Sequence, residues 1–79
     1  MPEEHIRKRE HFLDTVIRGL TDGQVADVLR IFLNSSREYR VIHSYPSDMC
    51  GKEYERELDK EFEFQKEKVM EYIRSFKNE

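Results

Sequence analysis

The stretch Lys52–Asn78, KEYERELDKEFEFQKEKVMEYIRSFKN, decides the fold of this chain. Its apolar residues recur at spacings of three, four and seven, which is the period of one face of an α-helix. This apolar stripe consists of Tyr54, Leu58, Phe62, Val69, Tyr72, Ile73 and Phe76, interrupted by the polar Gln65. Most of the residues between them are Glu, Lys or Arg, and the stretch contains no Gly or Pro. We therefore predict a long amphipathic helix over about residues 48–77, whose stripe must be covered by a partner.

The length and composition predict a single helical domain over residues 1–79. A chain of 79 residues lies in the size range where one hydrophobic core is only just sufficient for stability. Its charged fraction of 39% exceeds its hydrophobic fraction of 37%, which is typical of long, exposed helices. The net charge is −3. The chain as a whole therefore lacks the basic character of a nucleic-acid-binding domain.

The cysteine content and the N-terminus favour a cytoplasmic protein. Cys50 is the only cysteine, so an intrachain disulfide cannot form. The N-terminal residues lack the basic and then apolar layout of a secretory signal. No apolar run approaches the roughly 18 residues that span a membrane. We expect no membrane association.

Two shorter helices are predicted before the long one, over residues 3–18 and 22–34. Gly19 is placed to end the first helix. Thr21 and Gln24 have the spacing of a capping box, in which each side chain bonds the backbone N–H of the other residue. The second helix then has a broad apolar face, and the polar segment Asn34–Ser36 is predicted to end it. That face comprises Val25, Val28, Leu29, Phe32 and Leu33.

The segment between the second and third helices has two interpretations. Apolar and polar residues alternate over residues 39–45, and the content of Tyr, Val and Ile suits a short strand. A single strand would need a twin from a second chain, so an ordered loop or a helical extension is the preferred alternative. Pro46 breaks the chain before the last helix, and Ser47 or Asp48 is placed to cap it.

The predicted fold class is an all-α, three-helix arrangement in which the long helix overhangs two short antiparallel helices. An irregular or partly extended connection precedes the long helix. The overhanging stripe predicts a homodimer with C2 symmetry, in which Gln65 meets its own symmetry mate and fixes the register. The predicted interaction residues are Tyr54, Leu58, Phe62, Phe64, Val69, Tyr72 and Phe76.

Candidate catalytic and metal-binding residues are few. His5 and His11 are six residues apart, which places them on different sides of a helix, whereas helical metal ligands are three or four residues apart. His43 and Cys50 could meet across the turn at Pro46, but two ligands from one loop do not complete a tetrahedral site. As a nucleophile and base they would also need an orienting group and a pocket. We therefore predict no enzyme activity, no cofactor and no metal site.

Two basic segments suggest nucleic-acid binding as the alternative function. One is the cluster Arg7–Arg9 on the first helix. In the segment Arg37–Tyr45, cations alternate with aromatic rings, a composition that contacts phosphates and stacks on bases. The candidate residues are Arg7, Lys8, Arg9, Arg37, Tyr39 and Arg40, with His43 and Tyr45 beside them.

One short motif resembles a known family. Residues 54–60, YERELDK, are similar to the Ser-x-x-Leu-Asp signature of small helical aspartyl-phosphate phosphatases, with Glu55 at the position of the family's serine. The match covers seven residues, and we carry no activity over from it. The expected function is that of a small cytoplasmic, non-enzymatic regulator or adaptor. It would act through helix-mediated association with itself or with another protein.

Overall fold

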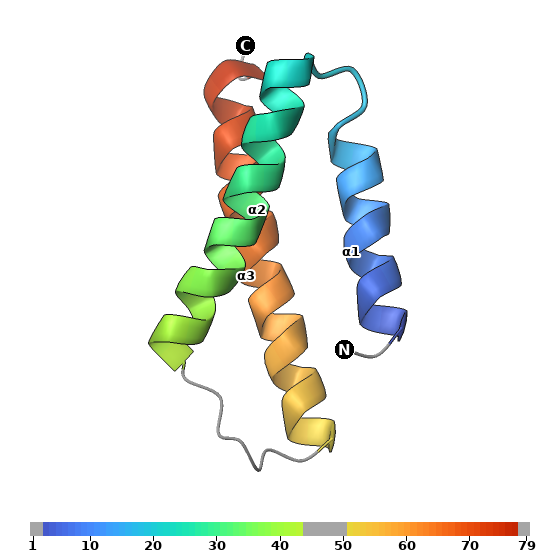
Figure 1. Cartoon of the computed structure of the whole chain (residues 1–79), viewed down its shortest axis with the longest axis vertical. Helices are drawn as coiled ribbons and strands as arrows, with labels where there is room; N and C mark the ends of the chain where they lie inside the picture. The colour runs from blue at the N-terminus through green and yellow to red at the C-terminus, as the bar shows by residue number, and fades with distance from the viewer. Residues whose placement is uncertain (1–2, 44–50, 78–79) are drawn as a thin grey trace.

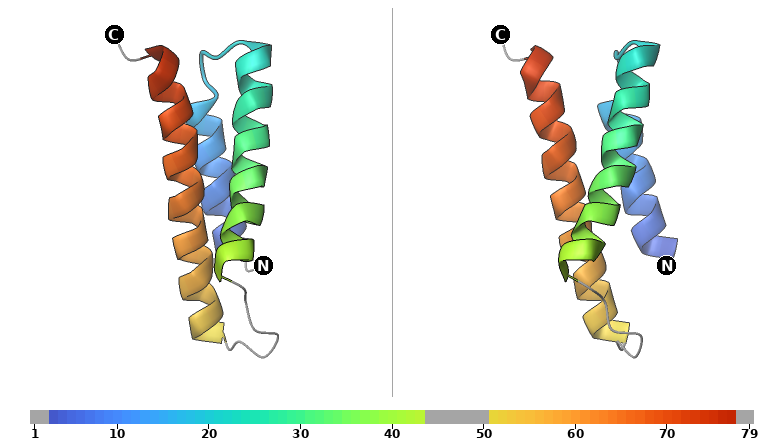
Figure 2. Two further views of the ribbon diagram at one scale, coloured as in Figure 1. Left: turned by 90° about the vertical axis from the view of Figure 1, so that its left-hand side faces the viewer. Right: turned by 60° about the vertical axis from the view of Figure 1, so that its left-hand side comes forward.

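The computed structural model describes residues 3–43 and 51–77, which form three helices. These are α1 (Glu3–Val16), α2 (Asp22–His43) and α3 (Gly51–Lys77). The predicted all-α, three-helix fold is confirmed, and α3 is the longest helix, as expected. Helices α2 and α3 form a closely packed antiparallel pair, and α1 lies farther from both (Figures 1 and 2).

The turn between α1 and α2 follows the predicted capping pattern. Helix α1 ends at Val16 rather than at residue 18, and Gly19 adopts a φ of 80°, which costs glycine little. The Thr21 N–H donates to Gln24 Oε1 at 3.0 Å, and the Gln24 N–H donates to Thr21 Oγ1 at 3.2 Å. The capping box is therefore confirmed. It satisfies two N–H groups at the start of α2 that have no partner within the helix.

The predicted end of the second helix at Asn34 is wrong, because α2 continues to His43. The serines do not break the helix. The Ser35 hydroxyl donates to the carbonyls of Ile31 and Phe32 within α2, at 2.7 and 3.0 Å. The side chain of Tyr39 is buried, and its ring stacks on that of His43 one turn further on, with centroids 4.2 Å apart. Residues 39–43 are therefore helical, and the strand interpretation is wrong for them.

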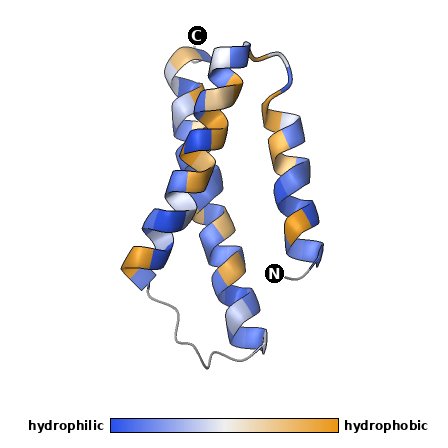
Figure 3. Cartoon of the chain, in the orientation of Figure 1, coloured by the Kyte–Doolittle hydropathy of each residue, from blue (hydrophilic) through white to orange (hydrophobic). Residues whose placement is uncertain are grey.

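The hydrophobic core lies between α2 and α3 and is closed on one side by α1. Phe12 of α1, Phe32 of α2 and Phe62 of α3 meet with ring centroids 5.8–6.4 Å apart. Phe12 meets Phe62 at 87°, an edge-to-face arrangement that aromatic rings favour. In Figure 3 the apolar residues recur at intervals along each helix, as expected for helices with one buried face. The buried members of this cluster are Val28, Phe32, Phe62, Val69 and Ile73.

Polar contacts fix how α2 lies against α3. The Gln65 amide donates from Nε2 to the Phe32 carbonyl at 2.9 Å. One turn further along α2, the Ser36 hydroxyl donates to Glu61 Oε2 at 2.6 Å. The paired residues thus rise along α2 as they fall along α3, which is an antiparallel register. Gln65 is therefore buried within its own chain, where it bonds Phe32, and it is not placed at a surface where it could meet a symmetry mate.

The expected overhang of the long helix is reduced because α2 is longer than predicted. Helix α2 has 22 residues instead of the expected 13 or so. It runs beside most of α3 in both views of Figure 2. The stripe of α3 is therefore buried within the chain from Leu58 to Ile73.

Some predictions concern residues outside the described ranges. Tyr45, Ser47, Asp48 and Cys50 are among them, and so is the predicted start of the third helix at residue 48. Within residues 3–43 and 51–77, no helix combines the length and the apolar character needed to cross a bilayer.

Two valines provide a matched test of this core. Val69 is fully buried on α3, whereas Val41 is 78% exposed on α2. We expect Val69→Ala to lower the free energy of unfolding by about 2 kcal/mol, because it removes two methyl groups from a packed site. Val41→Ala should change it by less than about 0.5 kcal/mol. Urea unfolding followed by circular dichroism measures both, and equal effects would contradict the packing of α3 against α2.

Candidate functional site

The structure buries three of the seven predicted interaction residues and leaves the other four half-buried. Leu58, Phe62 and Val69 are buried against α1 and α2. Tyr54, Phe64, Tyr72 and Phe76 are half-buried. The Phe64 ring lies 5.7 Å from that of Tyr39, and the Tyr72 hydroxyl donates to Asp27 Oδ2 at 2.7 Å. These contacts lie within a single chain, and more exposed apolar side chains are found on α2.

The basic cluster on α1 does not form one basic face. Arg7 pairs with Glu3 at 2.9 Å on the exposed side of the helix, and Lys8 reaches Asp59 of α3 at 3.6 Å. Arg9 is buried, and its guanidinium donates to the carbonyls of His5 and Leu58 at 3.1 and 2.9 Å. The three side chains therefore point in different directions, and Arg9 joins α1 to α3.

The side chains of the second predicted basic segment, residues 37–45, also point in different directions over its described part, residues 37–43. Arg37 is exposed on α2, but Tyr39 is buried and its hydroxyl donates to Glu57 Oε1 at 3.0 Å. Arg40 Nε donates to Glu61 Oε1 at 3.1 Å. These cations and rings hold α2 to α3 more than they present a surface for phosphates and bases.

Glu61 is the polar centre of the contact between α2 and α3, and its burial was not predicted from the sequence. Its side chain is 1% exposed and accepts hydrogen bonds from Ser36 and Arg40 on two successive turns of α2. A buried carboxylate is costly unless it is paired and hydrogen-bonded, and here both conditions are met. We regard this contact as structural, because its partners are all used within the chain.

The histidines are dispersed. His5 is buried with its Nδ1 3.4 Å from Asp59 Oδ1, an ion-pair distance without hydrogen-bond geometry. His11 is exposed, and His43 stacks on Tyr39. The predicted pairing of His43 with Cys50 lies outside the described residues. Within the described part of the chain, no three His, Cys, Asp or Glu side chains are grouped so that they could hold a metal ion.

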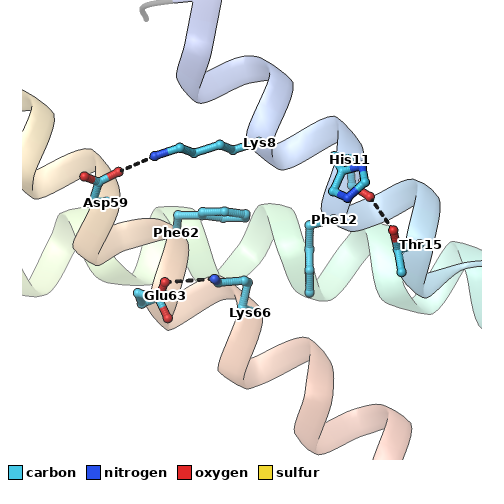
Figure 4. Close-up of a pocket in the computed structure, with 8 residues that line it drawn as sticks. All are labelled: Lys8, His11, Phe12, Thr15, Asp59, Phe62, Glu63 and Lys66. Carbon is cyan, nitrogen blue, oxygen red and sulfur yellow. Dashed lines mark hydrogen bonds and ion pairs between the residues drawn. The ribbon is translucent and has the colours of Figure 1, made fainter.

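A groove between α1 and α3 is the first candidate site. It has a volume of about 640 Å³, within the range of small-molecule sites. Figure 4 shows the rings of Phe12 and Phe62 at its centre, with one ion pair on each side of Phe62. Its lining residues are Lys8, His11, Phe12 and Thr15 from α1, and Asp59, Phe62, Glu63 and Lys66 from α3.

An exposed row of side chains on α2 is the second candidate site. We call Asp22, Ala26, Leu29, Leu33 and Arg37 the α2 outer row. They lie within about 80° of one another around the helix, at 100° per residue. Leu33 is 66% exposed and Leu29 is 41% exposed. The sequence analysis included both leucines in the broad apolar face of the second helix, and the structure leaves this edge of the face exposed.

Sequence reasoning missed the groove for a related reason. Phe62 was recognised as an apolar position and Lys8 as a candidate for phosphate contacts, but Lys66 looked like an ordinary solvated residue. Only the placement of α1 beside α3 brings these two cations to the same opening. No spacing within either helix could have shown this.

Comparisons with protein-family models, with curated proteins and with solved structures give no match for this chain.

Burial and a neighbouring carboxylate change the titration of Tyr39. Loss of solvent raises the pKa of this phenol from 10.0 to about 12, aided by the hydrogen bond to Glu57 and by the negative charges of Glu57 and Glu61. The hydrogen bond to Asp27 and partial burial likewise raise the pKa of Tyr72.

The raised pKa of Tyr39 predicts a loss of stability at alkaline pH. Above pH 10.0 the unfolded chain releases this proton while the folded chain keeps it until about pH 12. The unfolded state therefore binds fewer protons in this window, and the free energy of unfolding falls as pH rises. The stabilising effect should be complete below pH 10.0 and lost by about pH 12.

Tyr39→Phe is the matched variant for this test, because it removes the ionising hydroxyl and keeps the ring. Denaturant unfolding from pH 9 to pH 12 should show a steeper decline for the native chain than for the variant. Parallel declines would show that Tyr39 titrates normally.

Proposed function

We propose that this chain is a small, non-enzymatic regulator or adaptor of the cytoplasm that acts by helix-mediated association. Its first partner is a second copy of itself, and the contact surface is the α2 outer row. The observation that carries this proposal is the exposure of Leu29 and Leu33 at the centre of the row. Association would remove this apolar surface from water, at roughly 25 cal/mol per Å² buried.

The order of charges along the row supports a second copy as the partner. Asp22 stands at its start and Arg37 at its end, with Ala26, Leu29 and Leu33 between them. A two-fold axis beside Leu29 would make two α2 helices antiparallel. Asp22 of each copy would then face Arg37 of the other, and Ala26 would face Leu33. A C2 interface requires such self-complementarity.

The length of the row predicts a reversible dimer. Fifteen residue steps at 1.5 Å each give about 22 Å, or four helical turns. One helix pair of this length buries less surface than the 1,200 Å² or so at the low end of stable interfaces. The dimer should therefore form and dissociate over accessible protein concentrations.

Leu33→Asp tests the apolar centre of the row. Because both copies in a C2 dimer carry the substitution at the interface, we expect dimerisation to weaken by at least about a hundredfold. Ile42→Asp is the matched control, because Ile42 is 65% exposed on the same helix but about 180° away from Leu33. Sedimentation equilibrium measures the molar mass against concentration. If Leu33→Asp and Ile42→Asp have equal effects, the α2 outer row is not the interface.

Charge reversal tests the antiparallel arrangement. Asp22→Lys or Arg37→Glu alone should weaken dimerisation by about tenfold, because each replaces two attractive contacts with repulsive ones. The double variant Asp22→Lys/Arg37→Glu should regain most of the native affinity, since opposite charges face each other again. A double variant that is as weak as the two single variants combined would contradict the antiparallel pairing.

A further inference from the structure

We propose that the groove between α1 and α3 binds an organic anion with a flat aromatic body. The apolar floor of the groove is made by two rings held at right angles. Phe12 meets Phe62 with a centroid distance of 5.8 Å and an interplanar angle of 87°. A ligand ring entering the groove can lie against Phe12 while its edge meets Phe62, which is the geometry that aromatic groups favour.

The cations around the groove determine the sign of the charge that the ligand should carry. Lys8 and Lys66 stand at the opening, paired with Asp59 at 3.6 Å and with Glu63 at 2.8 Å. Arg9 does not line the groove, but its guanidinium lies 4.9 Å from the centre of the Phe62 ring, which does. Three positive side chains thus accompany two carboxylates, in a chain whose net charge is −3. The local field favours an anion.

A cationic ligand would find the aromatic floor already occupied. The Lys66 ammonium lies 4.6 Å from the centroid of Phe62, and the guanidinium of Arg9 also lies over this ring. Both cations already use the negative potential of the ring. A third cation would be repelled by them, whereas an anionic group can approach Lys8 and Lys66 together.

The ion pairs at the opening do not block an anion. Exposed ion pairs contribute little to stability, so the lysines can turn to a ligand at little cost. Lys8 reaches across from α1 to α3, and Lys66 lies on the opposite side of Phe62 in Figure 4. The anionic group would bind at the opening that both lysines line, and the aromatic body would lie over Phe12.

Anilinonaphthalene sulfonate is a suitable probe, because it combines an aromatic body with one negative charge and fluoresces when removed from water. Added to the full chain, it should bind saturably with one site per chain. Lys66→Gln should weaken binding about tenfold, since it removes a charged hydrogen-bond donor. Lys8→Gln should have a similar effect, which keeps the test valid if either variant proves less stable.

Lys60→Gln is the matched control. Lys60 lies on α3 and pairs with Glu57 three residues away, just as Lys66 pairs with Glu63, but it does not line the groove. It should change the affinity by less than about twofold. Equal weakening by Lys60→Gln and Lys66→Gln would show attraction by general charge and would overturn the proposal.

Two further measurements locate the bound probe. Amide chemical shifts should change around residues 8–15 and 59–66, and the cationic trimethylphenylammonium should bind at least tenfold more weakly than the anion. Leu33→Asp should leave probe binding intact. The groove proposal can therefore be tested separately from the proposed dimer. If Leu33→Asp abolishes binding, the probe occupies the α2 outer row, and the groove proposal is wrong.

Discussion

The fit of two buried polar side chains of α3 against α2 is the constraint on which the structure depends. Glu61 needs the Ser36 hydroxyl and the Arg40 guanidinium, and Gln65 needs the carbonyl of Phe32. A shift of one turn would leave a buried carboxylate and a buried amide without these partners, at a cost of several kcal/mol. Apolar residues alone would tolerate several registers. These polar contacts favour a single register of α2 against α3.

The position of α1 follows from the packing of α2 against α3 and explains both candidate surfaces. Arg9 donates to the carbonyl of Leu58, and Phe12 inserts between Phe32 and Phe62. These contacts hold α1 at one side of the helix pair. Helix α1 covers only one side of the wide apolar face of α2 and leaves Leu29 and Leu33 exposed. On its other side, α1 and α3 remain far enough apart to form the groove.

The apolar pattern of the sequence was sufficient to predict three helices and the buried face of α3, from Leu58 to Ile73. It failed for the second half of α2, because the residues that face α3 there are polar or amphipathic. Ser35, Ser36 and Tyr39 continue the helical spacing of Val28 and Phe32, but two of them are serines. A test that counts only apolar residues does not detect this continuation. The exposure of Leu29 and Leu33 was equally hidden, since it depends on where α1 packs.

The charges next to the groove indicate the charge of its ligand better than the net charge of the chain does. The net charge of −3 argues against an anionic ligand, and the sequence of Arg7, Lys8 and Arg9 suggests a basic face. In the fold these three cations separate: Arg7 stays at the surface, while Arg9 is buried with its guanidinium over the Phe62 ring. Lys8 and Lys66, 58 positions apart in the sequence, come to opposite sides of one groove. Because the field at a site depends on the nearest charges when salt screens the distant ones, the groove can attract an anion although the whole chain is acidic.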